Sequence, residues 1–182
     1  MGQAGNPFSK NELSVKGFVE GYELNFHLMT TTDAHEIVSW KYPEEYSFYN
    51  FDDSEETFAE LLDGTYYAVR DQDEPLIGFF CYGRNAQVPE GRNQHQYTGD
   101  NILDIGLGMM PELTGKGLGL TFLQAGIDFA IQQYQPAYLR LSVAAFNIRA
   151  TKVYSKMGFA QTGAFVNNGT AFIVMKMKVE LG

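Results

Sequence analysis

The stretch that most constrains the fold covers residues 104–130, DIGLGMMPELTGKGLGLTFLQAGIDFA. It begins with an apolar strand pattern that Pro111 ends, and it finishes with the apolar period of a helix. Between them lies a glycine-rich turn, residues 114–119. Glycines at a strand-to-helix junction let successive backbone N–H groups point into one concavity, and the helix adds unpaired amides and the positive end of its dipole. This junction predicts a site for phosphate oxygens; the alternative is a tight turn that binds nothing.

The glycine spacing excludes two common nucleotide-binding motifs. A P-loop requires Gly-Lys-Ser/Thr, which the sequence lacks. A Rossmann fingerprint requires G-x-G-x-x-G after the first strand, whereas Gly115, Gly117 and Gly119 alternate and lie past the middle of the chain. A nucleotide-dependent oxidoreductase is therefore nearly excluded.

Size and composition fit one folded domain. The chain has 182 residues, of which 45% are hydrophobic, which is enough for a substantial core. A net charge of -9 argues against nucleic acid as a ligand, and no apolar run approaches the ~20 residues of a membrane span. Cys81 is the single cysteine and lies in an apolar strand pattern typical of a core position. No basic and apolar leader opens the sequence, so we expect a cytoplasmic protein without nucleic-acid or membrane partners, and we predict no metal site.

Charge is unevenly divided along the chain. Residues 1–100 carry 6 Lys and Arg against 18 Asp and Glu, a balance of -12, and residues 101–182 carry 7 against 4, a balance of +3. The positive part would suit a polyanionic ligand and the acidic part a cationic amine. Uneven charge by chance is an equally good interpretation.

The periodicity of apolar residues and the positions of turn-forming residues divide the rest of the chain into strands and helices. We expect a flexible extension over residues 1–20 and one domain over residues 21–182. Strands are predicted at 23–29, 65–70, 76–82, 102–110, 138–143, 159–165 and 171–179. Helices are predicted at 34–40 and 54–62, between the glycine turn and Pro136, and between Asn147 and Gly158. The polar stretch 83–99 is either a mobile loop or an extended hairpin tip.

The C-terminal helix carries a second motif, NIRATKVYSKMGF, at residues 147–159. Members of the GCN5-related N-acetyltransferase (GNAT) superfamily commonly show Asn-x-x-Ala-x-x-x-Tyr-x-x-x-Gly-Phe at this place. Asn147, Ala150, Tyr154, Gly158 and Phe159 match it at every spacing.

The glycine turn is similar to the same superfamily's pyrophosphate arm, usually written Gln/Arg-x-x-Gly-x-Gly/Ala. Gly117 and Gly119 match its last two positions, while Thr114 stands where the family commonly has Gln or Arg. Both motifs occur in order within residues 22–180. The resemblance implies an α+β domain with a mixed sheet of about seven strands, about four flanking helices, and a V-shaped splay between the fourth and fifth strands.

The resemblance also implies a function. Family members transfer an acetyl group from acetyl-CoA to a primary amine by direct attack in a ternary complex. The acceptor is a small molecule or a protein amino group; Asp104, Ile105 and Gly106 resemble a motif of ribosomal-protein acetylases. The alternative is a catalytically silent domain that binds acyl-CoA as a sensor. Family members often form homodimers, and the sequence leaves the acyl length, the acceptor and the oligomeric state open.

Residue roles follow from the resemblance alone. Tyr154 would protonate the leaving thiolate and Asp104 would act as base; their alternatives are a core tyrosine and a solvated carboxylate at the end of a strand. Asn147 would contact the pantetheine arm or only cap its helix. The other expected contacts with the donor are Met109, Met110, Thr114, Gly115, Lys116, Gly117, Leu118, Gly119 and Leu120.

The segment 41–58 mixes aromatic and acidic residues and would line the acceptor side. Glu44, Glu45, Tyr46 and Tyr49 are the residues expected to bind an ammonium group there, through cation–π and carboxylate contacts. Aromatic residues in a loop equally often pin it to the core. The acceptor side would use Glu44, Glu45 or a chain of waters in place of Asp104 if that residue is not the base.

Overall fold

The computed structural model describes residues 18–19, 22–71 and 74–180. Most of the predicted extension over residues 1–20, and residues 72–73 between the predicted strands 65–70 and 76–82, lie outside this part of the chain. The elements are β1 (Phe18–Val19), β2 (Tyr22–Leu28), α1 (Thr31–Ser39), a 3-10 helix (Glu44–Tyr49), α2 (Glu55–Leu61), β3 (Tyr66–Asp71), β4 (Glu74–Tyr82), a 3-10 turn (Arg84–Ala86), α3 (Pro89–Asn93), β5 (Ile102–Met109), a 3-10 turn (Pro111–Leu113), α4 (Gly119–Tyr134), β6 (Tyr138–Ala144), α5 (Ile148–Met157), β7 (Ala160–Asn167) and β8 (Thr170–Lys178).

One mixed sheet runs through the molecule in the order β1-β2-β3-β4-β5-β6-β8-β7. Only the β5–β6 pair is parallel among the strand pairs of the described residues. Strands β2 to β8 are the seven strands that the sequence predicted. The additional strand, β1, has two residues.

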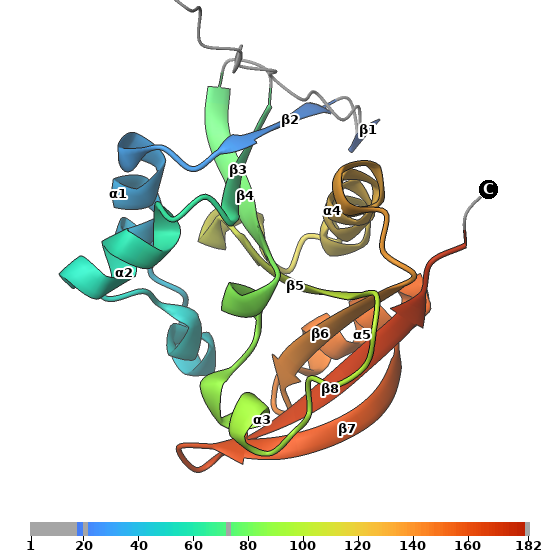
Figure 1. Ribbon diagram of the computed structural model, residues 1–182. Coiled ribbons are helices and arrows are strands. Elements are labelled where there is room, and N and C mark those ends of the chain that lie inside the picture. The colour runs from blue at the N-terminus through green and yellow to red at the C-terminus, as the bar shows by residue number, and fades with distance from the viewer. Residues whose placement is uncertain (1–17, 20–21, 72–73, 181–182) are drawn as a thin grey trace, which may run out of the picture.

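The sheet opens between β5 and β6, which are the fourth and fifth of these seven strands. The two strands pair only where Ile102–Asp104 meets Tyr138–Arg140. Beyond that point β5 stays with β4 as far as Met109, whereas β6 stays with β8 as far as Ala144. The two parts of the sheet therefore diverge, as Figure 1 shows, and the predicted splay is confirmed.

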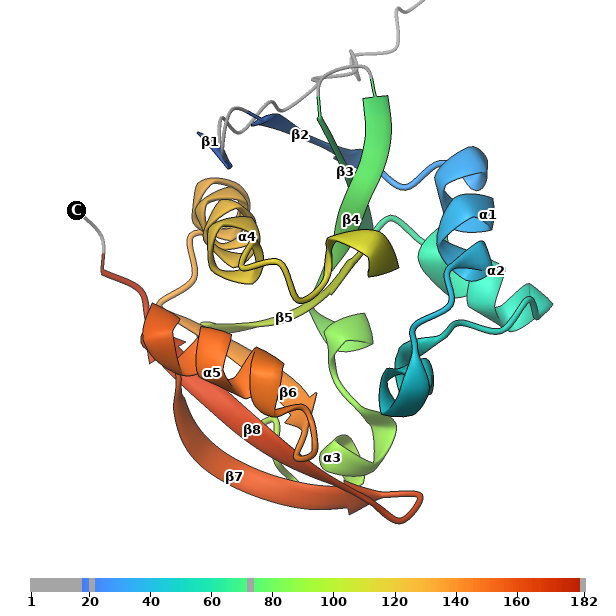
Figure 2. The same cartoon turned by 180° about the vertical axis from the view of Figure 1, so that it is seen from behind.

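Helices cover both faces of the β2–β4 part of the sheet. Figures 1 and 2 show α1 and α2 on one side of these strands and α4 on the other. Side chains of β4 alternate accordingly, because successive residues of a strand point to opposite faces. Phe79 and Cys81 pack in the core beneath α1 and α2, and Phe80 and Tyr82 pack against α4. No helix within the described residues is both long enough and apolar enough to cross a bilayer.

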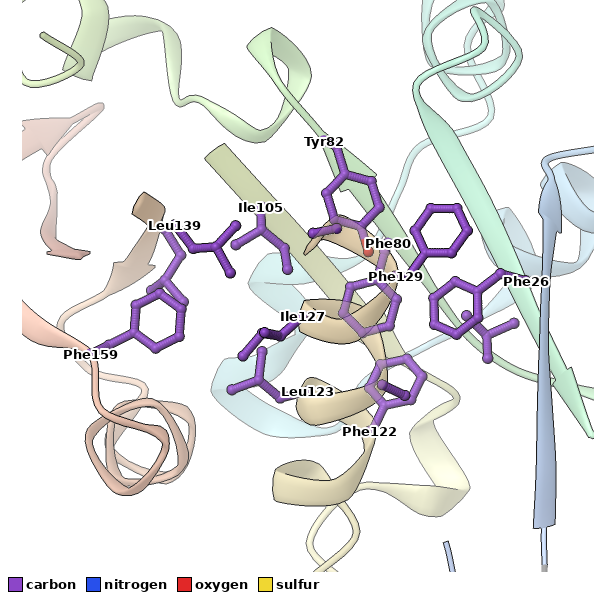
Figure 3. Close-up of a cluster of buried hydrophobic side chains, with 14 of the residues drawn as sticks. Phe26, Phe80, Tyr82, Ile105, Phe122, Leu123, Ile127, Phe129, Leu139 and Phe159 are labelled. Carbon is purple, nitrogen blue, oxygen red and sulfur yellow. The ribbon is translucent and has the colours of Figure 1, made fainter. Parts of the chain in front are cut away.

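The larger core is built on aromatic rings between α4 and the sheet. The rings of Phe26 and Phe129 stack with their centroids 4.7 Å apart, and those of Phe80 and Phe122 are 4.6 Å apart. Figure 3 shows these four rings gathered beside Leu123 and Ile127 of α4. A Cβ at position 126 would overlap the Phe80 ring, so Gly126 lets the helix approach the sheet this closely.

The apolar stripe predicted for this helix was partly wrong. The helical period of the sequence places Leu120 and Tyr134 on one stripe with Leu123, Ile127, Ala130 and Ile131, yet Leu120 and Tyr134 are 39% and 42% exposed. Phe122 and Phe129 take the central positions instead. The helix carries apolar residues on most of its circumference, so its period alone does not fix which face meets the sheet.

Polar caps fix the helix ends largely where the sequence predicted them. The Ser54 hydroxyl caps α2 by accepting a hydrogen bond from the Thr57 amide. Gly158 ends α5 at φ 113°, a left-handed conformation that suits glycine. Helix α1 begins earlier than expected, because Thr30 and Asp33 form a reciprocal capping box.

The stretch 83–99 is neither a long loop without structure nor a hairpin tip. It contains the 3-10 turn Arg84–Ala86 and the short helix α3, which packs against β7. Pro89 lies in the first turn of α3, where proline favours the start of a helix.

Candidate active site

A cleft of about 530 Å³ occupies the opening between β5 and β6. One wall is β5 from Ile105 to Met109, and the other is β6 from Leu141 to Val143 together with side chains of α5. The glycine turn and the start of α4 close one end, and tyrosines of the segment 42–49 line another side. The cleft therefore collects most of the stretches that the sequence singled out.

The glycine turn has the backbone conformation that an anion site needs. Gly115 and Gly117 have φ of 71° and 77°, which residues with a Cβ rarely adopt. Leu118, the N-cap of α4, provides no side-chain hydrogen bond to the helix start. Since the first amides of a helix have no partner within it, this end of α4 presents free donors beside an open turn. The arrangement fits a diphosphate.

Residues of this turn contribute unequally to the cleft. Thr114, Gly115, Gly117, Gly119 and Leu120 line it. Two of the remaining expected residues do not: Lys116 is exposed outside the lining, and Leu118 packs against the core.

Met109 and Met110, at the end of β5, have different backbone partners. Met109 lines the cleft, and its carbonyl oxygen accepts a hydrogen bond from the Tyr42 hydroxyl at 2.6 Å. Met110 is not part of the lining; its amide donates to the Ile77 carbonyl at 2.8 Å. The backbone at Met109 thus remains beside the cleft while that of Met110 joins β4.

Tyr154 projects from α5 into the wall of the cleft. Burial, and secondarily the charge that Tyr49 would carry as a phenolate, raise the pKa of Tyr154 above its usual value near ~10. In the described part of the chain, no hydrogen bond engages its hydroxyl. Tyr154 is therefore a protonated, available phenol.

Asn147 both caps α5 and reaches across the cleft. Its side-chain oxygen accepts a hydrogen bond from the Ala150 amide at 3.1 Å, and its side-chain nitrogen donates to the Tyr49 hydroxyl at 3.1 Å. Asn147 also lines the cleft. The cap predicted from sequence is present, and the same side chain connects α5 to the 3-10 helix Glu44–Tyr49.

Asp104 lies in a buried ion pair rather than in the cleft lining. Its side chain accepts hydrogen bonds from Arg140 Nε at 2.7 Å and Arg140 Nη2 at 2.8 Å, and Gln87 Nε2 donates to the same carboxylate at 2.8 Å. Asp104 is 3% exposed. Both oxygens are engaged where β5 and β6 begin to part, so this geometry favours a structural role, and the base role stays a prediction.

The segment expected at the acceptor side combines a pocket wall with a pin to the core. Tyr46 and Tyr49 line the cleft, whereas Phe48 packs edge-on against Phe146 with ring centroids 5.6 Å apart. Glu44 and Glu45 are exposed and lie outside the lining. Among the described residues that line the cleft there is no carboxylate.

The cleft also holds polar residues that were not predicted from the sequence, notably Arg149 and Ser142. The Ser142 hydroxyl lies 2.6 Å from that of Tyr97, which comes from the 83–101 connection. Arg149 follows Asn147 by two positions, inside the second motif, and the positive balance of the C-terminal part was the one signal that could have indicated it.

Comparison with known proteins agrees with this geometry. Residues 31–159, more than half of the chain, match the family model described as the Acetyltransferase (GNAT) family. The chain belongs to this family. The family resemblance and the fold predicted from the sequence are thereby confirmed.

Relatives of this GNAT protein include the spermine/spermidine N(1)-acetyltransferase of Bacillus subtilis strain 168. The two are 27% identical over 114 residues, which cover 63% of this chain and 68% of the relative. A GNAT-family acetyltransferase from Bacillus anthracis superposes with a TM-score of 0.65 at 15% identity, covering 85% of this chain and 94% of that one. The enzyme AAC(6')-Ib, solved with paromomycin and acetyl-CoA, gives a TM-score of 0.64 at 17% identity over 85% and 93%.

Proposed function

We propose that this GNAT protein transfers an acetyl group from acetyl-CoA to a primary amine. The observation that carries the proposal is a single cleft that holds an uncapped helix start, an open glycine turn and an available phenol. Family membership supports the donor, and the name of the B. subtilis relative supports an amine as acceptor.

The donor would lie along β5 and end at the glycine turn. Amides of residues 115–120 would bind the diphosphate, and the backbone at Met109 and the side chain of Asn147 would contact the pantetheine arm. When bound, acetyl-CoA supplies an acetyl group activated as a thioester. The positive φ of Gly117, with no atom within 4 Å of a Cβ built there, keeps the backbone open to such a ligand.

Tyr154 would act as the general acid of the reaction. Transfer to an amine leaves a basic sulfur that requires a proton, and a phenol whose pKa lies above ~10 keeps its proton at neutral pH. Tyr154 Oη would hold that proton at the cleft wall until the sulfur leaves.

A cationic polyamine is the first acceptor to test. The B. subtilis relative is named for spermine and spermidine, and Glu44 and Glu45 are exposed on the 3-10 helix whose Tyr46 and Tyr49 line the cleft. Carboxylates outside and aromatic rings inside suit a chain of several ammonium groups, one of which enters as the neutral amine. Protein amino groups are the second class of acceptor to test.

Calorimetric titration with acetyl-CoA tests the donor site. We expect micromolar binding to the wild type and its loss in Gly117→Glu, which places a carboxylate at the diphosphate site. Gly169→Glu is the matched control, because Gly169 has nearly the same φ, 79° against 77°, equally open space at Cβ, and lies in the β7–β8 turn.

The outcomes separate the two functional alternatives. Binding followed by thiol release with spermidine, with a peptide amino terminus or with another amine would support the enzyme. Binding without release for any amine tested would support the silent acyl-CoA-binding domain. If the wild-type protein did not bind acetyl-CoA, both alternatives would be refuted.

A further inference from the structure

Arg149 is a cation of the cleft that no carboxylate of the described residues pairs with. Two other arginines of the described residues do form ion pairs: Arg70 with Asp33 and Glu36, and Arg140 with Asp104. Arg149 is exposed, lines the cleft, and forms no such pair within the part of the chain that the structure describes. Its guanidinium donors are available to a ligand.

The guanidinium lies between the two ends of the cleft. Its Cζ is 4.5 Å from the centroid of the Tyr46 ring, on the 3-10 helix Glu44–Tyr49. On the other side it reaches the glycine turn, since a Cβ built on Gly115 would lie 3.0 Å from Arg149 Nη1. Gly115 thus leaves room for the guanidinium as well as adopting a positive φ.

No charged side chain of the glycine turn lines the cleft. The Thr114 hydroxyl donates to the Pro111 carbonyl at 2.7 Å and is therefore occupied within the turn. Lys116 is exposed outside the cleft lining. A planar guanidinium with free N–H groups is well suited to bind two phosphate oxygens at once.

We propose that Arg149 binds the diphosphate of the donor and that Tyr46 positions Arg149 for it. This inference rests on the proposed function, because it assigns residues to the same donor. Arg149 supplies the charged side chain that Thr114 does not, and it does so from α5 rather than from the turn. The contact between Arg149 and Tyr46 then joins the donor site to the acceptor-side segment.

The first test measures the dissociation constant of acetyl-CoA by calorimetry. Charge-assisted hydrogen bonds of this kind predict that Arg149→Ala raises Kd about 10- to 100-fold, with partial recovery in Arg149→Lys. Lys152→Ala is the matched control, since Lys152 is exposed on the same helix and outside the cleft lining. An unchanged Kd in Arg149→Ala, or an equal rise in Lys152→Ala, would overturn the assignment.

A second ligand identifies which phosphate Arg149 contacts. Acetyl-3'-dephospho-CoA keeps the diphosphate and lacks the phosphate on the ribose. We expect Arg149→Ala to weaken this ligand and acetyl-CoA by the same factor. A loss confined to acetyl-CoA would place the contact at the ribose phosphate and refute the diphosphate assignment.

The role of Tyr46 is tested by a double-mutant cycle on the same Kd. Tyr46→Ala should raise Kd about 2- to 5-fold, as expected for an exposed cation–π contact, and should have no effect in the Arg149→Ala background. Tyr46→Phe keeps the ring and should restore the wild-type Kd. Additive effects, or a Tyr46→Phe variant as weak as Tyr46→Ala, would refute the positioning role.

Failure of this inference is distinguishable from failure of the proposed function. Wild-type protein that does not bind acetyl-CoA contradicts both. Wild-type protein that binds and turns over, with an Arg149→Ala variant that binds equally well, contradicts only the role of Arg149.

Discussion

At the residue scale, Tyr154 belongs both to the packing of α5 and to the cleft. Its ring packs near that of Phe159, with centroids 6.2 Å apart, while the residue lines the cleft. The core interpretation and the catalytic one therefore describe two sides of the same side chain. Phenylalanine keeps the packing and removes only the hydroxyl, which makes it the informative substitution.

We expect Tyr154→Phe to lower kcat by roughly 10²-fold and to leave the Kd of acetyl-CoA unchanged, because it removes a general acid and no binding contact. Burial raises the pKa of Tyr154, so the acid form is present at neutral pH and is lost only as pH rises through the raised pKa. The wild-type rate should therefore show no loss attributable to this group below about pH 10. Steady-state kinetics with Tyr138→Phe as control would check this, since Tyr138 lies outside the lining. An unchanged kcat would make Tyr154 a core residue only.

Asp104 offers a second residue-scale prediction, on stability rather than rate. Asp104→Ala would leave the buried guanidinium of Arg140, itself 4% exposed, without its carboxylate. Breaking a buried pair in this way costs about 3–5 kcal/mol, which denaturant unfolding would detect. Asp100→Ala, an exposed carboxylate just before β5, is the control and should cost little. Normal stability together with a rate that is lost at neutral pH and recovers at alkaline pH, where the amine is already neutral, would instead assign Asp104 as the base.

At the element scale, the approach of α4 to the sheet depends on Gly126. A methyl group there would overlap the Phe80 ring, and Phe80 is fully buried, so neither element can move without disturbing the rings around it. We expect Gly126→Ala to destabilise the fold by about 1–3 kcal/mol despite the better helix propensity of alanine. Thermal or denaturant unfolding against Gln132→Ala, an exposed position of the same helix, measures this. A stabilised variant would contradict the packing described for Figure 3.

Asp33 joins α1 to two strands and should make the fold sensitive to acid. Burial would raise the pKa of Asp33, but hydrogen bonds from His27, Thr30 and Arg70 outweigh it and hold the pKa well below its usual range. A lowered folded-state pKa adds stability that is present above the unfolded value near ~4 and is lost as pH falls below it. Wild-type protein should therefore lose more unfolding free energy between about pH 5 and pH 3 than Asp33→Asn does. Parallel losses in the two proteins would exclude Asp33 as the source.

At the scale of the whole molecule, the sequence predicted more of the fold than of the site. The glycine turn and the motif of residues 147–159 are local patterns, and they lie at the cleft as the sequence indicated. Pairings between distant segments were not predictable. Asp104 meets Arg140 only through the parallel register of β5 and β6, and Arg149 meets Tyr46 only where two distant segments come together at the cleft. Charge and spacing identify such residues as polar without identifying their partners.

The uneven charge of the chain gives a whole-molecule prediction. The acidic residues before position 100 include Glu44 and Glu45, which lie beside the tyrosines of the cleft. If these charges attract a cationic amine, kcat/KM for spermidine should fall roughly 10-fold between low salt and ~0.5 M salt, while kcat changes little. The double variant Glu44→Gln/Glu45→Gln should show a smaller salt dependence. Equal salt dependence in both proteins would favour the chance interpretation of the charge.

The opening beside β5 also bears on how readily the protein would aggregate at high concentration. A strand with one unpaired edge usually invites strands from other molecules, and proteins cover or shorten such edges. Here residues 105–109 of β5 pair with β4 on one side only, and their other edge faces a cleft of about 530 Å³ walled by β6, α5 and the segment 42–49. Because these walls flank the open edge, we expect a strand of another molecule to have little access to it. The same walls that shape the cleft therefore protect its open backbone from aggregation.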